Sequence, residues 1–309
     1  MRVQIKVAAV IASLLVAFVA FVAPLPQQTV AQQSEPVPTN PACSVQPNPA
    51  GGFWQCTLDE EFDGTTLNRN LWVPITTAES GFHSGPECLI DSPNNASVGN
   101  GVLTLTVRKE DAPFTCQDAD SGPFTTQYTS EQVATYGTFA QAYGRFEIRA
   151  RVPNTPIPGI QESFWLWPND QAKYGPWPQS GEIDIAEMFS RWNDHAFPYI
   201  HYNNYQDYNV TTYNCVISDL GQFHTYAVEW TPDTLTIIYD GQTCLVDNWN
   251  PMAPQVKPQP FDQPFIIALT QLLGVEPNPF DPATTPLPAS TQVDFVRVWK
   301  DVGGTQPVV

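Results

Sequence analysis

Basic residues are scarce in this chain of 309 residues. Lysine and arginine together number 13, against 31 aspartates and glutamates, so the formal net charge is −18. An excess of acidic residues repels the phosphates of nucleic acids and the surface of anionic membranes. The composition therefore argues against nucleic acid and against a membrane surface as the partner of this protein.

Metal-binding patterns are also missing from the sequence. The four histidines are widely scattered, and the six cysteines form neither a Cys-x-x-Cys pair nor a cysteine and histidine spacing typical of zinc sites. No metal and no cofactor is predicted.

The sequence contains only one long apolar run, the 17 residues from Val7 to Ala23. Arg2 and Lys6 precede this run and Thr29-Val30-Ala31 follows it, a pattern typical of a signal peptide over residues 1–31. Its removal takes away two of the 13 basic residues and no acidic one, which leaves a net charge of −20. We expect a secreted protein without membrane association after cleavage; the alternative is an uncleaved N-terminal helix that anchors it.

The six cysteines suit an exported protein with up to three disulfides. Six cysteines allow 15 pairing schemes. We predict pairing in sequence order, in which Cys43 joins Cys56 and ties the preceding proline-rich tail (residues 32–51) to the domain.

No internal repeat, heptad pattern or long amphipathic helix occurs. Short alternating segments between Gly, Pro, Asn and Asp clusters recur instead, as in residues 102–107 and in residues 234–239 before the turn at Asp240-Gly241. This pattern predicts an all-β sandwich over residues 52–300, followed by a C-terminal tail over residues 301–309. We expect the protein to be a monomer.

Three acids stand close together in the run 181–189, which reads Gly-Glu-Ile-Asp-Ile-Ala-Glu-Met-Phe. Glu182 and Asp184 alternate with apolar residues, so they should share one strand face while Ile183 and Ile185 face the core. Crowded carboxyl groups cannot all ionise freely, and one of them should keep its proton while another stays charged. Such a pair suits the cleavage of a glycosidic bond.

Glu187 lies five residues after Glu182 and would point away from it in a regular strand. A one-residue β-bulge between Asp184 and Glu187 would return its side chain to the same face. The two glutamates would then be about 13 Å apart at their Cα atoms and about 5 Å apart at their carboxyl groups, as in a glycosidase that retains the anomeric configuration. From the run alone, the alternative is an acidic solvent-exposed face on an ordinary strand.

The run resembles the E-x-D-x-x-E motif of glycoside hydrolase family 16, in its laminarinase-like branch. Further similar segments follow in the family's order over about residues 52–300. They are Asp59-Glu60-Glu61-Phe62-Asp63-Gly64, Gly101-Val102-Leu103-Thr104-Leu105, residues 143–151, Phe164-Trp165-Leu166-Trp167-Pro168, residues 223–230, and residues 293–299. The resemblance implies a β-jelly roll of two curved antiparallel sheets, with a glycan bound across the concave face.

The resemblance also implies the role of each acid. Glu182 matches the nucleophile, Glu187 matches the acid/base, and Asp184 matches the residue that holds the nucleophile by hydrogen bonding. His201 matches a family histidine near the acid/base on the next strand, although a lone histidine is often structural. With the resemblance, the alternating Arg145, Glu147 and Arg149 are expected to border the glycan site; without it, they would be interpreted as a solvated sheet face.

Three tryptophans are candidates for stacking on sugar rings. Trp165 and Trp167 should face the acids if Phe164 and Leu166 face the core, although tryptophans often serve only in packing. Trp177 stands between Pro176 and Pro178, which should stiffen the loop before the acidic strand.

The sequence departs from the family at two places. Gln161-Glu162-Ser163 replaces the Trp-Pro-Ala of many laminarinases, and Leu272-Leu273-Gly274-Val275-Glu276-Pro277 replaces a Gly-Gly segment. Both are expected to shape sugar subsites without affecting the catalytic carboxyl groups. The two departures weaken the inference of a β-1,3-glucan substrate. From the family resemblance and the acidic net charge, we expect an endo-acting hydrolase of a neutral polysaccharide, most simply β-1,3-glucan. The alternatives are mixed-linkage β-glucan or galactan as substrate, transglycosylation, and glucan binding without catalysis.

Overall fold

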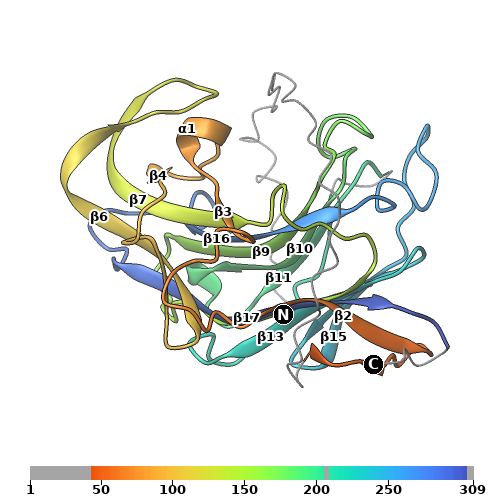
Figure 1. Ribbon diagram of the computed structural model, residues 1–309. Helices are drawn as coiled ribbons and strands as arrows, with labels where there is room; N and C mark the ends of the chain where they lie inside the picture. The colour runs from red at the N-terminus through yellow and green to blue at the C-terminus, as the bar shows by residue number, and fades with distance from the viewer. Residues whose placement is uncertain (1–42, 205–208, 305–309) are drawn as a thin grey trace, which may run out of the picture.

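The computed structural model describes residues 43–204 and 209–304. Two layers of mainly antiparallel strands lie one above the other and together curve nearly into a barrel (Figure 1). The predicted all-β sandwich is confirmed. The strands are β1 (Gln46–Pro47), β2 (Phe53–Glu60), β3 (Val73–Pro74), β4 (Glu87–Leu89), β5 (Ala96–Gly99), β6 (Val102–Cys116), β7 (Phe124–Ala134), β8 (Gly144–Arg151), β9 (Ile160–Pro168), β10 (Glu182–Phe189), β11 (Phe197–His201), β12 (Asn209–Thr211), β13 (His224–Trp230), β14 (Leu235–Tyr239), β15 (Gln242–Asp247), β16 (Phe265–Leu273) and β17 (Ala289–Asp301). A short helix α1 (Thr77–Ser80) and a 3-10 turn η3 (Ser190–Trp192) join them.

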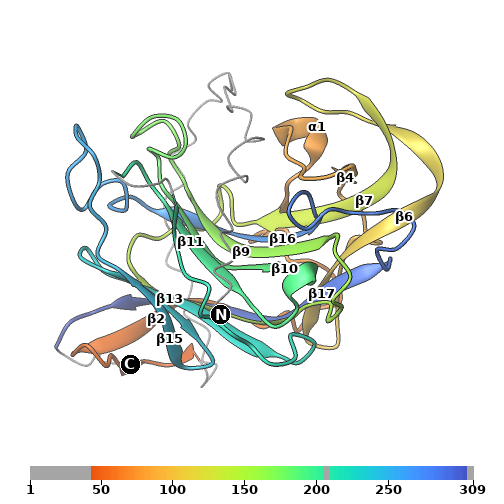
Figure 2. The same ribbon diagram turned by 180° about the vertical axis from the view of Figure 1, so that it is seen from behind.

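The upper layer in Figure 1 contains β7, β16, β9, β10, β11 and β12, paired in that order. The lower layer contains β17, β8, β13, β14 and β15, together with β1, β2, β5 and the first half of β6. The long β6–β7 hairpin belongs to both layers, because β6 pairs first with β17 and then with β7, which continues to β16. Figure 2 shows the same two layers from behind.

The core fills the space between the layers. Phe164 and Leu166 of β9 and Ile183 of β10 are fully buried there, together with Phe146 and Ile148 of β8 from the other layer. The alternation of apolar residues along each strand therefore predicted the core face correctly.

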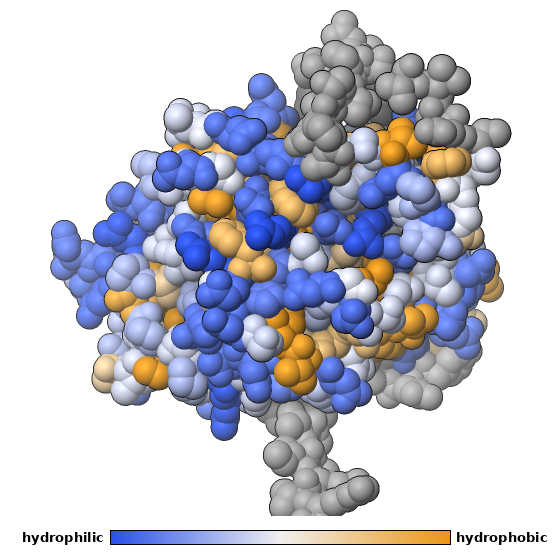
Figure 3. All heavy atoms as spheres, turned by 90° about the horizontal axis from the view of Figure 1, so that it is seen from below, coloured by the Kyte–Doolittle hydropathy of each residue, from blue (hydrophilic) through white to orange (hydrophobic). Residues whose placement is uncertain are grey.

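The polar residues of β8 lie elsewhere than expected. Because β8 belongs to the lower layer and its apolar residues fill the core, Arg145 and Glu147 point to the outer side of that layer, away from β10. Arg145 forms ion pairs with Glu147 and with Glu229 of β13, while Arg149 pairs with Asp294. The expectation that these residues border the glycan site is wrong. The lower face in Figure 3 is mostly hydrophilic, with small separate apolar groups.

Three disulfides join the cysteines in sequence order, as predicted: Cys43–Cys56, Cys88–Cys116 and Cys215–Cys244. The first one holds the start of the described chain to β2, and β1 pairs with the same strand. Part of the predicted tail, residues 46–47, is thus in the sheet. The predicted signal peptide lies outside the described residues. Within residues 43–204 and 209–304, no helix has the length and apolar character needed to span a bilayer.

Candidate active site

A β-bulge in β10 brings its three acids to one face of the upper layer. Asp184 lies opposite Tyr199 of β11, whereas Glu187, three residues later, lies opposite Phe197, only two residues from Tyr199. The pairing with β9 shifts over the same stretch. The bulge predicted from the sequence is therefore present, and it gives Glu187 the same orientation as Glu182 and Asp184.

The bulge is held from the opposite layer. Tyr239, the last residue of β14, donates a hydrogen bond from its hydroxyl group to the carbonyl oxygen of Ile185, at 2.7 Å. Ile185 lies between the two shifted pairings and is fully buried. A bulge disrupts the ladder of backbone hydrogen bonds, and a buried carbonyl without a partner is costly. Tyr239 supplies that partner across the core.

Glu182 receives a hydrogen bond from the loop before β10. The indole nitrogen Nε1 of Trp177 donates to Oε2 of Glu182 at 2.6 Å. The Trp177 ring also lies 5.3 Å from the ring of His201, centroid to centroid. The expected position of Trp177 beside the acids is confirmed. Trp177 also hydrogen-bonds Glu182 directly, a contact that was not predicted from the sequence.

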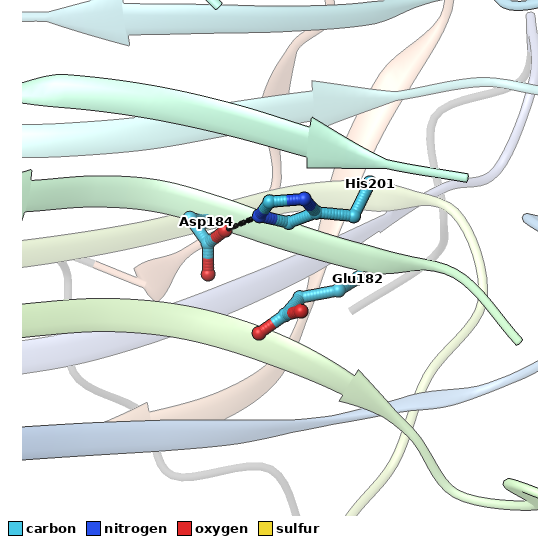
Figure 4. A group of neighbouring side chains, drawn as sticks. All are labelled: Glu182, Asp184 and His201. Atoms are coloured by element: carbon cyan, nitrogen blue, oxygen red, sulfur yellow. Dashed lines mark ion pairs between the residues drawn. The ribbon is translucent and has the colours of Figure 1, made fainter. Parts of the chain in front are cut away.

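Asp184 is bound to the neighbouring strand. Its Oδ2 lies 2.9 Å from Nε2 of His201, and the two side chains lie next to Glu182 (Figure 4). Asp184 is only 3% exposed. From the family pattern, we expected Asp184 to hold Glu182 by a hydrogen bond. In the structure, Trp177 donates the hydrogen bond to Glu182, and Asp184 contacts His201.

Glu187 is held by β9. Both the hydroxyl group of Ser163 and the amide nitrogen of Gln161 donate to the same oxygen, Oε1, at 3.0 and 3.3 Å. These two residues belong to the first departure from the family pattern. The expectation that the departure leaves the catalytic carboxyl groups unaffected is therefore wrong, because register places Ser163 directly opposite Glu187.

The electrostatics of the cluster follow from burial. Burial, and next the charge of Asp184, raise the pKa of Glu182 to about 8, although His201 and the Trp177 hydrogen bond act in the opposite direction. Burial and Glu187 raise the pKa of Asp184 well above its usual range. Burial also raises the pKa of Glu187, against His201, Ser163 and Gln161. The raised pKa values favour at least one retained proton in the cluster near neutral pH. The predicted division into one protonated and one charged acid stays a prediction.

Trp165 and Trp167 lie half-buried on the same face of the upper layer as the acids. Trp165 is opposite Asp184, its indole nitrogen donates to Oγ1 of Thr270 at 2.8 Å, and its ring meets that of Trp167 edge-on at 5.6 Å. The predicted orientation of both rings is confirmed. Part of each ring packs on small and aliphatic residues of β7 and β16.

Among the described residues, Glu182, Asp184 and His201 form a group of side chains close enough together to bind a metal ion. Oxygen and nitrogen atoms of Glu182, Asp184 and His201 lie within 4.8 Å of one another. The contact of Asp184 with His201 and the hydrogen bond from Trp177 to Glu182 account for these positions without an ion.

Comparison with known proteins agrees with this geometry. The sequence profile of the glycosyl hydrolases family 16 matches residues 87–277, more than half of the chain. The chain belongs to glycosyl hydrolase family 16. It is a glycoside hydrolase, and the family resemblance drawn from its motifs is confirmed.

Relatives in the family support the same assignment. The glucan endo-1,3-beta-glucosidase A1 of Niallia circulans is 28% identical over 289 residues, which cover 85% of this hydrolase but only 39% of that protein. The beta-glucanase of Rhodothermus marinus is 32% identical over 222 residues, covering 67% of this chain and 70% of the relative. The laminarinase catalytic domain of Thermotoga maritima superposes with a TM-score of 0.68 at 28% identity, covering 81% of this chain and 99% of that one. The predicted jelly-roll fold is thereby confirmed.

Proposed function

We propose that this family 16 hydrolase is a secreted, retaining endo-β-1,3-glucanase, with Glu182 as nucleophile and Glu187 as acid/base. The observation that carries the proposal is the bulge in β10, which gathers three carboxyl groups on one strand face. The names of the Niallia circulans and Rhodothermus marinus relatives support the substrate class.

The reaction runs in two steps in this proposal. In the first, a carboxylate oxygen of Glu182 attacks the anomeric carbon, the bond from that carbon to the glycosidic oxygen breaks, and Glu187 gives its proton to the departing oxygen. In the second, water attacks the same carbon and gives a proton to the Glu187 carboxylate, while the ester bond to Glu182 breaks. Two inversions retain the configuration, and both carboxyl groups return to their starting states.

The contacts of each acid suit its step. Glu182 must be ionised. Burial and the charge of Asp184 oppose this by raising its pKa to about 8, whereas His201 and the Trp177 hydrogen bond favour its charged form. When Glu187 carries its proton, one source of the repulsion that raises the pKa of Glu182 is gone. Asp184, bound to His201, is proposed to tune this proton balance without forming a bond to the sugar.

The substrate in this proposal is a neutral glucan. A chain with a net charge of −18 is poorly suited to sulfated polymers. Trp165 and Trp167 offer partly exposed ring surface beside Asp184 on which sugar rings can stack. Mixed-linkage glucan or galactan hydrolysis uses the same carboxyl groups and is tested together with the main proposal. Transglycosylation, in which a sugar hydroxyl group replaces water in the second step, also uses them. We propose that the protein acts as a monomer.

Reducing-end release by the purified chain on laminarin, barley β-glucan, agarose and carrageenan tests the proposal. We expect laminarin to be cleaved, proton NMR to detect the β-anomer first, and Glu182→Gln to be inactive while it still binds laminarin. Cleavage of another polymer alone would correct the substrate. Firm binding without cleavage of any polymer would favour a glucan-binding protein, and initial release of the α-anomer would exclude retention.

A further inference from the structure

Two side chains of β9 meet the carboxyl group of Glu187 on the same atom. Ser163 is opposite Glu187 in the pairing of β9 with β10, and Gln161 lies two residues along β9, on the same face. Ser163 Oγ and Gln161 Nε2 both donate to Oε1, at 3.0 and 3.3 Å. The other oxygen, Oε2, receives neither of these hydrogen bonds.

This asymmetry decides which oxygen carries the proton. In a protonated carboxyl group the carbonyl oxygen is the better hydrogen-bond acceptor, and the other oxygen is a hydroxyl donor. Two donors on Oε1 therefore place the proton on Oε2. After the proton has left, the same donors stabilise the carboxylate, because hydrogen bonds to the charged form favour it.

We propose that Ser163 and Gln161 are positioning residues that hold Oε1 of Glu187 against β9 and direct Oε2 to the reacting oxygen. This inference rests on the proposed role of Glu187 as acid/base. Both residues stand where many laminarinases have Trp-Pro-Ala, and the alanine of that pattern has no donor to offer in the place of the Ser163 hydroxyl.

Other titratable groups also act on Glu187. They come from the same strand, from the neighbouring β11 and from β14 below: Glu182, Asp184, Tyr199, His201 and Tyr239. Ser163 and Gln161 face it from β9 and do not titrate, and Glu162 between them points into the core. Removal of either donor leaves the effect of burial on Glu187 less opposed, so its pKa should rise.

The test compares Ser163→Ala and Gln161→Met with the wild type in pH profiles of kcat/KM on laminarin. A donor lost from a charged group should move the alkaline limb upward by about one pH unit and lower kcat/KM at the optimum about tenfold. Ser163→Thr keeps the hydroxyl group and should restore the wild-type profile. Ser290→Ala, which removes a hydroxyl hydrogen-bonded to Thr106 in the lower layer, serves as the matched control and should change neither quantity.

A substrate that needs no acid separates positioning from binding. In an aryl β-laminaribioside, the aryl group is a good leaving group and departs without a proton from Glu187. The kcat/KM of Ser163→Ala on this substrate should therefore equal that of the wild type. Equal losses on both substrates, or an alkaline limb that stays in place in both variants, would overturn the inference.

Glu187→Ala distinguishes this failure from that of the proposed function. We expect it to lose laminarin cleavage and to keep cleavage of the aryl glycoside. If Glu187→Ala cleaved laminarin like the wild type, the acid/base assignment itself would be wrong. If it behaved as expected while the Ser163 and Gln161 variants matched the wild type, only the positioning role would fall.

Discussion

At the scale of single residues, the hydrogen bond from Trp177 to Glu182 is the contact with the clearest consequence. Trp177→Phe keeps an aromatic ring but removes the donor that lies 2.6 Å from Oε2. A hydrogen bond to a charged group contributes about 1.5–3 kcal/mol, so kcat/KM on laminarin should fall about 10- to 100-fold.

The same substitution should change the pH dependence. The Trp177 hydrogen bond lowers the pKa of Glu182, so its loss raises that pKa and moves the acidic limb of kcat/KM to higher pH. Trp167→Phe is a suitable control, because it changes a tryptophan on the same face of the upper layer and should leave the acidic limb in place. An unchanged limb in Trp177→Phe would show that the nucleophile does not depend on this bond.

The sequence predicted the grouping of the three acids better than the contacts that hold them. Glu182, Asp184 and Glu187 stand in one strand of eight residues, so alternation grouped Glu182 with Asp184 and a single bulge added Glu187. Ser163 and Gln161 lie 24 and 26 residues away on β9, and their contact with Glu187 depends on the register between two strands. Alternation within each strand excludes a register shift by one residue, but it does not distinguish registers that differ by two residues.

At the scale of elements, the bulge of β10 depends on a hydrogen bond from the other layer. Tyr239→Phe removes the hydroxyl group that satisfies the buried carbonyl of Ile185 and should destabilise the fold by about 1–3 kcal/mol. Because the bulge sets the direction of Glu187, kcat should fall as well. Urea unfolding and laminarin cleavage measure the two effects.

Tyr226→Phe is the matched control for this prediction. Tyr226 is buried beside Tyr239, with ring centroids 5.3 Å apart, and its hydroxyl group has no hydrogen-bond partner among the described residues. Removing that hydroxyl should therefore leave stability unchanged or raise it. Similar losses in both variants would mean that the hydrogen bond to Ile185 does not stabilise the bulge.

The bulge itself was predictable, whereas its support was not. Glu187 lies five positions after Glu182, and a regular strand cannot place both side chains on one face, so an irregularity was required. Tyr239 follows 54 residues after Ile185 in a strand of the other layer. The β8 residues illustrate the same limit, because alternation separates Arg145 from Phe146 without showing which layer the strand joins.

At the scale of the whole molecule, buried acids outside the site make stability depend on pH. Burial raises the pKa of Glu131 to about 9, and burial raises that of Glu162 to about 8 against a hydrogen bond from Gln271. Glu162 lies in the core face of β9 and is 2% exposed. Both groups are therefore protonated in the folded protein at neutral pH, where the unfolded chain has released its protons.

Glu162→Gln tests this dependence. Since the folded-state pKa lies above the unfolded value of 4.5, the stabilisation from the Glu162 proton is complete below pH 4.5 and is lost as the pH rises to about 8. The loss amounts to about 1.4 kcal/mol per pH unit within that window. Glutamine keeps the shape and the acceptor for Gln271 without a proton to lose. The free energy of unfolding in urea should therefore be the same for the variant and the wild type at pH 4, and a few kcal/mol higher for the variant at pH 8.

Glu276→Gln is the control, because Glu276 is exposed and its substitution should change stability little at either pH. An equal gain for Glu162→Gln at both pH values would contradict the assignment of a buried proton.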